Sequence, residues 1–258
     1  MSLVQVERYE RVTALILNRP ERMNALGVDL VSTLSERLAE VSVDPGVSCV
    51  VLAAAGDKAF CTGADLKERE AMTREQAWSF LDLLRSTFQK LEDCPVPTIA
   101  AIHGYALGGG LELALCCDLR VASESAVMGL TEVRLGIIPG AGGTQRLPRV
   151  VGESRARRMV FSGERLSASE AAACGLVEEV VDADQLYPRA LELASVIALG
   201  APLALRAAKR AMCGLDASQR AARLDWERAC YAPLLDTEDR NEALAAFRQK
   251  RTPRFLGR

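Results

Sequence analysis

The sequence predicts an α/β fold that ends in a helical C-terminal region. In the first two thirds of the chain, short apolar runs rich in β-branched residues alternate with longer amphipathic segments, a pattern typical of an α/β core. From about Ser167 onward the pattern is mainly helical. The chain has 258 residues, of which 49% are hydrophobic, so it can bury a large core.

Four runs of the sequence predict buried strands. Each is rich in β-branched residues and is bounded by proline, glycine or charged residues, as buried strands are. They are residues 12–17, 47–53, 98–102 and 119–122. No repeat of fixed period is found in the sequence.

Six segments predict amphipathic helices. In residues 28–43 and 77–91, large apolar side chains recur at three- and four-residue spacing, which places them on one face of a helix. Four further helices are predicted near the end of the chain, at residues 182–199, 202–212, 219–235 and 238–250.

Composition excludes several classes of protein. The net charge of −2 at pH 7 offers no overall attraction for nucleic acid or for an anionic membrane surface. The eight cysteines show no Cys-x-x-Cys spacing, so we expect reduced thiols and a cytoplasmic location. The first ten residues lack the apolar core of a targeting segment. No run approaches the roughly 18 apolar residues of a membrane span.

Two glutamates lie close to glycine-rich stretches. Glu112 follows residues 108–110, and Glu132 comes eight residues before Gly140. A lone carboxylate among apolar residues is costly to bury unless it is paired, hydrogen-bonded or protonated, so we predict that the two form an acid and base pair. The alternatives are an acid favoured by the helix dipole for Glu112 and a surface ion pair with Arg134 for Glu132.

Backbone amides near these glutamates are candidates for binding an oxyanion. Residues 103–118 begin after a strand-like run and open a helix, so the N–H groups near Gly109 lack intrahelical partners. Residues 59–68 form a second loop that enters a helix, where the N–H of Ala64 can be the other donor. Such donors stabilise a developing negative charge, which predicts a site that activates an acyl group.

The glycine-rich stretches do not match the known phosphate-binding loops. Neither is followed by Gly-Lys-Ser/Thr, and neither forms a Gly-x-Gly-x-x-Gly turn in a first βαβ unit, so a P-loop NTPase and a Rossmann dehydrogenase are disfavoured. His103 is the only histidine, so it cannot belong to a multi-histidine metal cluster, and no nucleophile-elbow motif accompanies it. We therefore predict no metal site.

In their order and spacing these motifs resemble the crotonase (enoyl-CoA hydratase/isomerase) superfamily. The resemblance covers nearly the whole chain, at residues 18–20, 24–26, 63–65, 104–118, 132–147 and 246–251. Three segments are most similar to the 3-methylglutaconyl-CoA hydratases, a group that includes an AU-specific RNA-binding enoyl-CoA hydratase; these are residues 64–69, 95–102 and 227–231.

The resemblance implies a fold and a reaction. The fold is a crotonase-like spiral of ββα units over residues 1–195, followed by a helical oligomerisation region over residues 196–258. The protein is expected to form a homotrimer or a dimer of trimers. The reaction is reversible hydration of a 2-enoyl-CoA, in which Glu112 and Glu132 handle water and proton. The amides of Ala64 and Gly109 stabilise the thioester enolate, and no separate cofactor is needed because coenzyme A is part of the substrate.

The resemblance also implies binding residues. Six of them hold the coenzyme A moiety, largely through backbone groups: Arg22, Ala25, Leu26, Thr62, Asp65 and Leu66. Gly140 belongs to the site, and Phe247 and Lys250 cover the nucleotide from the terminal helix. A substrate such as 3-methylglutaconyl-CoA carries a distal carboxylate, which should meet a cation or a hydroxyl. The candidates are Lys67, Arg69, Arg74 and Tyr231, each of which could equally be a solvated helix residue.

Three other functions remain as alternatives. A general short-chain enoyl-CoA hydratase or an enoyl-CoA isomerase would use the same family scaffold. An RNA-binding protein is the alternative of another class, because the most similar group includes an RNA-binding member whose first helix is lysine-rich. Residues 21–44 contain no lysine here, and their acids outnumber their two arginines, so we predict no nucleic-acid partner.

Overall fold

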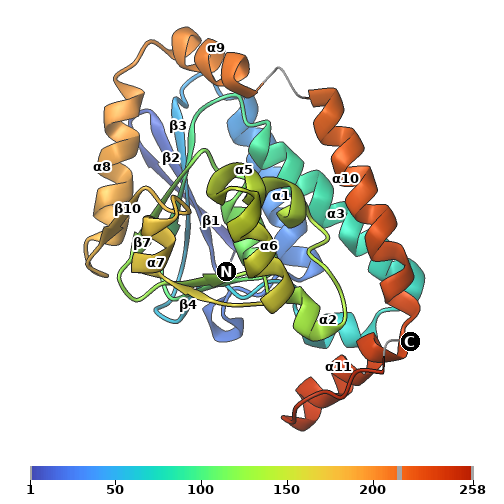
Figure 1. The fold of residues 1–258 in the computed structure, drawn as a ribbon. Helices are drawn as coiled ribbons and strands as arrows, with labels where there is room; N and C mark the ends of the chain where they lie inside the picture. Colours follow the sequence, from blue (N-terminus) through green and yellow to red (C-terminus); the bar gives the residue numbers. More distant parts are fainter. Residues whose placement is uncertain (1, 214–216, 257–258) are drawn as a thin grey trace.

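The computed structural model describes residues 2–213 and 217–256. Residue 1 of the predicted core region and residues 214–216, 257 and 258 of the predicted C-terminal region lie outside the described residues. It contains two β-sheets surrounded by helices (Figure 1), which confirms the predicted α/β class. The four predicted strands and six predicted helices are all present, with ends that agree or differ by a few residues.

The larger sheet has six strands in the order β1-β2-β3-β5-β7-β10. Strands β1 and β2 are antiparallel, and the pairs from β2 to β10 are parallel. The bounds are β1 Val4–Tyr9, β2 Val12–Leu17, β3 Cys49–Ala54, β5 Thr98–Ile102, β7 Leu119–Ser123 and β10 Glu179–Val181.

Both faces of this sheet are covered. Val12, Ala14 and Ile16 of β2 pack with helix α8 (Leu186–Ala198), whereas Leu15 and Leu17 face the main core. Because both faces are buried, the central strands have continuous apolar sequences in place of the alternating pattern of a half-exposed strand. This is why these runs could be identified from the sequence.

The smaller sheet has four strands in the order β4-β6-β8-β9. Strands β4, β6 and β8 are parallel, and β9 is antiparallel to β8. The bounds are β4 Ala59–Cys61, β6 Tyr105–Leu107, β8 Val127–Gly129 and β9 Leu166–Ser167. These strands have only two or three residues each, too few for a periodic pattern, so the sequence did not predict them.

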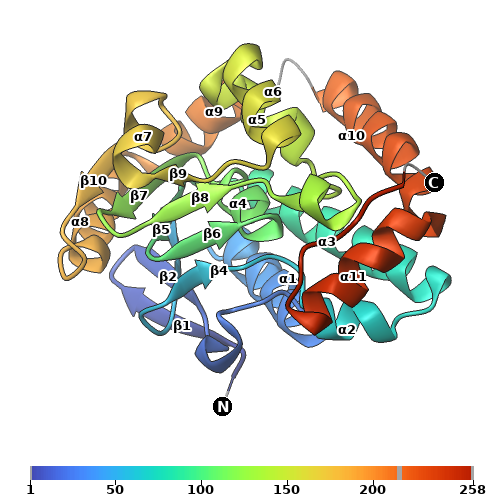
Figure 2. The ribbon, with the colours of Figure 1, turned by 60° about the horizontal axis from the view of Figure 1, so that its bottom comes forward.

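The two sheets are linked by ββα units, as the family resemblance implies. Strands β3, β5 and β7 of the larger sheet lead into β4, β6 and β8 of the smaller one, and each pair is followed by one or more helices (Figure 2). These and the other helices of the core are η1 Pro20–Arg22, α1 Val28–Val43, α2 Leu66–Ala71, α3 Arg74–Glu92, α4 Gly109–Ala114, η2 Glu132–Leu135, α5 Gly143–Val151, α6 Glu153–Ser162 and α7 Ala168–Ala173.

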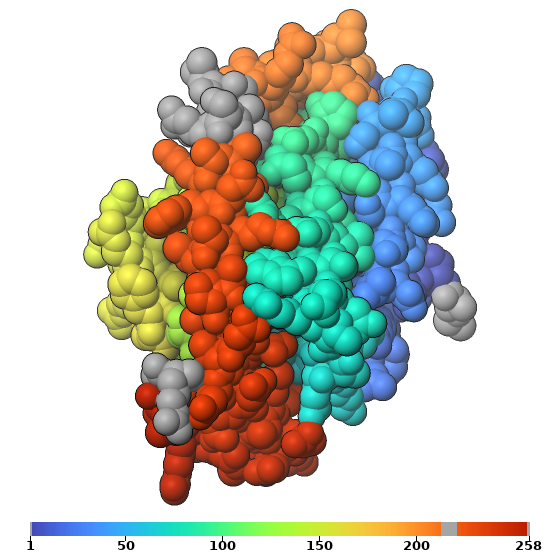
Figure 3. All heavy atoms as spheres, turned by 90° about the vertical axis from the view of Figure 1, so that its right-hand side faces the viewer, coloured from blue at the N-terminus to red at the C-terminus, as the bar shows by residue number. Residues whose placement is uncertain are grey.

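The C-terminal helices run around the outside of this core (Figure 1). They comprise α8, α9 Pro202–Cys213, α10 Ala217–Tyr231, η4 Ala232–Asp236 and α11 Glu238–Gln249. Helix α9 is anchored by Lys209, whose Nζ donates to Asp118 Oδ2 at 2.6 Å and to the Val96 carbonyl at 3.0 Å. Helix α10 lies between α3 and the α5–α6 segment on the surface (Figure 3).

Among the described residues, no single helix has both the length and the apolar composition of a membrane span. Helices α8 and α9 meet these criteria only when taken together, and they are bent by 103° where they join.

Candidate active site

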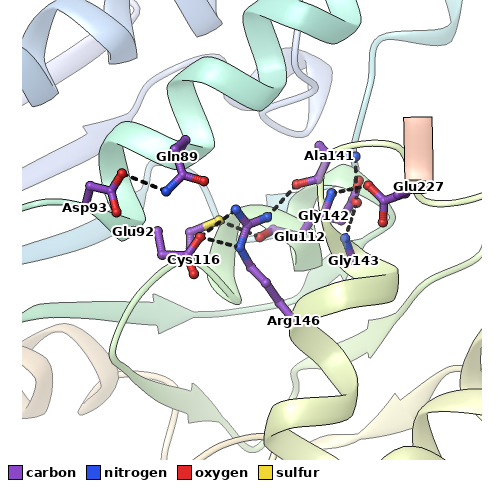
Figure 4. A network of polar contacts seen from close by, with 10 residues as sticks. All are labelled: Gln89, Glu92, Asp93, Glu112, Cys116, Ala141, Gly142, Gly143, Arg146 and Glu227. Atoms are coloured by element: carbon purple, nitrogen blue, oxygen red, sulfur yellow. Dashed lines mark hydrogen bonds and ion pairs between the residues drawn. The ribbon is translucent and has the colours of Figure 1, made fainter. Parts of the chain in front are cut away.

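Glu112 is held at the start of helix α4 by backbone amides from another element. Its carboxylate is buried, with 3% of the residue exposed, and its Oε1 accepts from the Ala141 N–H at 2.9 Å and the Gly143 N–H at 2.7 Å. Both donors belong to the loop that opens helix α5 (Figure 4). These bonds show that Glu112 is more than a helix-dipole acid, because its side chain is oriented by a second segment of the chain.

Glu132 is buried on the 3₁₀ helix η2 without a hydrogen-bond partner. Neither of its carboxylate oxygens contacts a donor within the described ranges. The sequence alternative of an ion pair with Arg134 is wrong, because the guanidinium of Arg134 donates to the Ser162 carbonyl at 3.1 Å. Gly108 leaves room for the carboxylate: its φ is +53°, and a Cβ there would lie 3.2 Å from Glu132 Oε1.

The two carboxyl groups differ in how readily they lose a proton. Burial, and then the nearby charge of Glu227, raise the pKa of Glu112 to about 8, while its two N–H contacts oppose this rise. Burial, and then the charge of Glu112, raise the pKa of Glu132 well above its usual value. Because Glu112 alone accepts hydrogen bonds from other segments, it ionises first and Glu132 keeps its proton.

A third buried glutamate, Glu227 on helix α10, contacts the same loop. It accepts from the Gly142 N–H at 2.7 Å, from the Thr144 N–H at 3.1 Å and from the Thr144 hydroxyl. The sequence analysis did not single out this residue. The sequence does contain a signal for it: Glu227 follows Leu224 by three residues and precedes Tyr231 by four. This spacing places an acid on the buried face of a helix.

The backbones of Ala64 and Gly109 lie next to each other and line one small space. A parallel bridge joins residues 26 and 64: the Leu26 N–H donates to the Gly63 carbonyl at 2.8 Å, and the Asp65 N–H donates to the Leu26 carbonyl at 2.9 Å. Since donors alternate sides along an extended chain, the Ala64 N–H points the other way. A Cβ on Gly109 would lie 3.7 Å from the Ala64 nitrogen, so the two amides are neighbours.

Two cavities meet beside Ala64. The inner cavity has a volume of about 100 Å³ and is lined by Ala64, Gly109, Glu112, Glu132, Gly140 and Tyr231, among others. The outer cavity has a volume of about 510 Å³ and is lined by Arg22, Ala25, Asp65, Lys67 and Phe247, among others. Thr62, Ala64 and Leu66 line both, so a ligand that fills both cavities passes beside the Ala64 amide.

Arg69 and Tyr231 lie together at the wall of the inner cavity. Arg69 is 6% exposed, its Nη2 donates to the Tyr231 hydroxyl at 3.0 Å, and its guanidinium carbon lies 5.8 Å from the centre of the Phe80 ring. No carboxylate of the described residues lies within ion-pair distance of Arg69. A buried guanidinium with this environment can bind an anionic group of a ligand.

Other predicted residues lie away from the inner cavity. Lys67 lines the outer cavity, and Arg74 is on the surface, where it pairs with Asp236 at 3.0 Å. The structure therefore brings neither of them to the acyl end, contrary to the prediction that either could meet a distal carboxylate there. Lys250 follows the last residue of helix α11 in an exposed position, and Leu26 is buried beneath Gly109; neither lines the inner or the outer cavity.

Two basic residues of the outer cavity were not found from the sequence. Arg134 and Arg165 line it together with Arg22 and Lys67, although they belong to different segments of the chain. Their spacing gives no signal, because only the fold brings them together. In the described part of the chain, no three His, Cys, Asp or Glu side chains form a group that could hold a metal ion.

Comparison with known proteins identifies what this arrangement resembles. The family described as Enoyl-CoA hydratase/isomerase matches residues 7–258. Human "Enoyl-CoA hydratase domain-containing protein 2, mitochondrial" is 47% identical, over 96% of this chain and 86% of its own. Human "Methylglutaconyl-CoA hydratase, mitochondrial" is 42% identical, over 97% and 75%. A crystal structure of an enoyl-CoA hydratase from Bacillus anthracis superposes with a TM-score of 0.82 at 44% identity, covering 99% of this chain and 100% of that one.

Proposed function

The chain belongs to the enoyl-CoA hydratase/isomerase family, and on this premise we propose that it reversibly hydrates a short 2-enoyl-CoA whose acyl group carries a distal carboxylate, as 3-methylglutaconyl-CoA does. The product would be 3-hydroxy-3-methylglutaryl-CoA. Coenzyme A enters as part of the substrate, and no separate cofactor takes part.

The thioester carbonyl binds at the junction of the two cavities. There its oxygen accepts hydrogen bonds from the amides of Ala64 and Gly109, two residues that line the same space. These donors stabilise the negative charge that develops when water adds to the conjugated double bond. The thioester is thereby polarised before any proton moves.

The two glutamates divide the proton transfers. Glu112 is the group that ionises first, so it takes a proton from water as the oxygen attacks the β-carbon. Glu132 keeps its proton and delivers it to the α-carbon, which completes the addition of water. The reverse reaction uses the same groups with their protonation states exchanged.

The outer cavity supplies the site for the coenzyme. Four basic side chains line it, and a nucleotide with phosphate groups needs cations of this kind: Arg22, Lys67, Arg134 and Arg165. Exposed Phe247 adds an apolar surface at the same opening. The coenzyme therefore lies outside, and the acyl group reaches inward past Ala64.

The single observation that supports a carboxylated acyl group is the environment of Arg69. Its buried guanidinium lines the inner cavity beside the Tyr231 hydroxyl. Burial, and then the charge of Arg69, lower the pKa of Arg240, so a second cation lies close by. A distal carboxylate would bind favourably in this positive field, and the small cavity accommodates only a short chain.

The reaction class is tested with crotonyl-CoA, by following the loss of its enoyl absorbance. Glu112→Gln and Glu132→Gln should each lower kcat by about 100-fold or more, because each removes one proton-transfer group. Circular dichroism spectra like that of the unchanged protein would show that the fold is intact. Full activity in either variant would rule out the role assigned to that residue.

The substrate is tested by comparing kcat/KM for 3-methylglutaconyl-CoA and crotonyl-CoA. The first should be preferred, and Arg69→Met should lower its kcat/KM by roughly 10- to 150-fold, the effect of losing a hydrogen bond to a charged group. Crotonyl-CoA, which has no distal carboxylate, should be affected far less. Lys67→Met is the matched control, since Lys67 is a cation of the same helix that lines the outer cavity. Equal losses on both substrates in Arg69→Met would identify a general short-chain hydratase.

A further inference from the structure

Two buried glutamates share four consecutive backbone amides at the start of helix α5. Glu112 accepts from the N–H groups of residues 141 and 143, and Glu227 accepts from those of residues 142 and 144, so the acceptors alternate along the chain. Figure 4 shows both glutamates with residues 141 to 143. Building on the proposed function, we propose that Glu227 is a positioning residue for hydration. From helix α10 it fixes the loop that orients Glu112 and places a second negative charge beside that carboxylate.

The contacts of Glu227 favour its ionised form. Two N–H groups and the Thr144 hydroxyl face its oxygens. The side-chain amide of Gln145 donates to the Thr144 hydroxyl oxygen at 2.9 Å, which leaves the hydroxyl proton for Glu227. A carboxylate that accepts three hydrogen bonds is stabilised as an anion, even though burial raises the pKa of Glu227.

Glu227 accepts half of the backbone hydrogen bonds that hold residues 141–144 to the two glutamates. The amides of residues 141–144 donate in turn to the two glutamates. If Glu227 is lost, the amides of residues 142 and 144 lose their acceptor, although those of residues 141 and 143 still bind Glu112. The loop has one further anchor, since Arg146 Nη1 donates to the Ala141 carbonyl at 2.6 Å. Arg146 also binds Glu92 of helix α3 at 2.7 Å, so helices α3, α5 and α10 meet at this loop.

The charges around Glu112 determine the direction of the expected pH effect. Glu227 on α10 disfavours a negative charge on Glu112, Arg146 on α5 favours it, and Glu132 on η2 keeps its proton while Glu112 ionises. Cys116, just after the end of helix α4, donates its thiol to the Glu112 carbonyl at 3.1 Å, and Arg69 and Tyr231 line the same cavity as Glu112. Because Glu112 must be ionised to accept the water proton, kcat rises with pH through its pKa. Removing the charge of Glu227 lowers that pKa, so the rise occurs at lower pH.

The experiment compares pH profiles of kcat with crotonyl-CoA. Glu227→Gln removes the charge at nearly constant size, and should move the acid limb to lower pH by about one unit while lowering the plateau about 10-fold. Glu227→Asp keeps the charge but shortens the reach, so the limb should stay in place and only the plateau should fall. KM should change little in both, because the outer cavity is untouched.

Asp225→Asn is the matched control. Asp225 also connects helix α10 to the core, but it does so by accepting from Arg85 of helix α3 at 3.1 Å. This variant should leave limb and plateau unchanged, and equal effects in Asp225→Asn and Glu227→Gln would overturn the proposal. Thr144→Val removes the hydroxyl bond to Glu227, together with the bond that Gln145 donates to that hydroxyl, and leaves both backbone bonds to Glu227 in place. It should move the limb in the same direction by a smaller amount.

Failure of this proposal can be told apart from failure of the proposed function. Suppose that Glu112→Gln is inactive, but that the acid limb of the kcat profile lies at the same pH in Glu227→Gln, in Thr144→Val and in the unchanged protein. Glu227 then has no positioning role, although the proposed function stands. If Glu112→Gln is fully active, the proposed function fails first. Should Glu227→Gln not fold, an unmoved limb in Thr144→Val overturns the proposal by itself.

Discussion

Replacing Gly110 by alanine should lower the activity about 100-fold, although Gly→Ala inside a helix usually stabilises a protein by about 0.5–1 kcal/mol. Gly110 lies in helix α4 between the amide of Gly109 and the carboxylate of Glu112. A Cβ there would lie 2.0 Å from the carbonyl oxygen of Cys61 and 2.7 Å from its carbon. Both contacts are with backbone, so no side-chain rotation can relieve them.

The size of the effect follows from this geometry. An ordinary carbon–oxygen contact is about 3.3 Å, so helix α4 and strand β4 must separate by roughly 1 Å. Cys61 precedes Ala64 by three residues, and Gly110 directly follows Gly109, so the two oxyanion amides move apart. A misplacement of about 1 Å at a catalytic group lowers the rate about 100-fold. Overpacking should also lower the free energy of unfolding by about 1–3 kcal/mol, which lowers the melting temperature by about 2–6 °C.

The assay is kcat for crotonyl-CoA together with a thermal melt. Gly46→Ala is the control, because Gly46 lies in an exposed turn where an added Cβ would meet only the end of the Asp44 side chain, at 3.1 Å. It should leave both quantities nearly unchanged. A Gly110→Ala protein with full activity and an unchanged melting temperature would refute the close approach of α4 to β4.

Three further predictions concern charged residues. Lys209→Met should lower the free energy of unfolding, measured with denaturant, by about 2–3 kcal/mol; the loss stays below that of a fully buried pair because the Asp118 side chain is 31% exposed. The folded protein raises the pKa of Glu112 from 4.5 to about 8, so this group's contribution to stability is present below pH 4.5 and is lost as the pH rises to about 8. Between these pH values the melting temperature of Glu112→Gln should therefore fall less than that of the unchanged protein. Arg74→Ala should retain hydratase activity on both substrates within about twofold, since its pair with Asp236 is more than half exposed; a selective loss on the carboxylated substrate would contradict the placement of Arg74 outside the acyl site.

Much of the fold could be predicted because its signals are local. Helix α1 was identified with its observed bounds, and strands β2 and β5 were found as continuous apolar runs. Their side chains are buried on one helix face or on both sheet faces, which leaves a periodic or continuous pattern in the sequence. The three-residue strands β4, β6 and β8 leave no such pattern, because pairing with neighbours, not their own sequence, defines them.

The site was predictable only in part, for the same reason. Glycine-rich segments and an acid in an apolar run point to Glu112 and to the amide of Gly109 from local sequence alone. The neighbourhood of Arg69 and Tyr231 could not be derived in this way, because 162 positions separate them and only packing brings them together. Lys67 and Arg69 looked equivalent in sequence, yet the helix points one to the outer cavity and the other to the inner one.

The contacts that complete the site have a consequence for folding. Glu227 reaches amides 85 and 83 positions earlier in the chain, and Tyr231 meets an arginine 162 positions earlier. Such contacts close long loops, so they form late, after the local helices and the sheet have been established. In refolding, we expect secondary structure to return before enzymatic activity. A molecule whose sheets are complete but whose helix α10 has not docked would be a folded but catalytically silent intermediate.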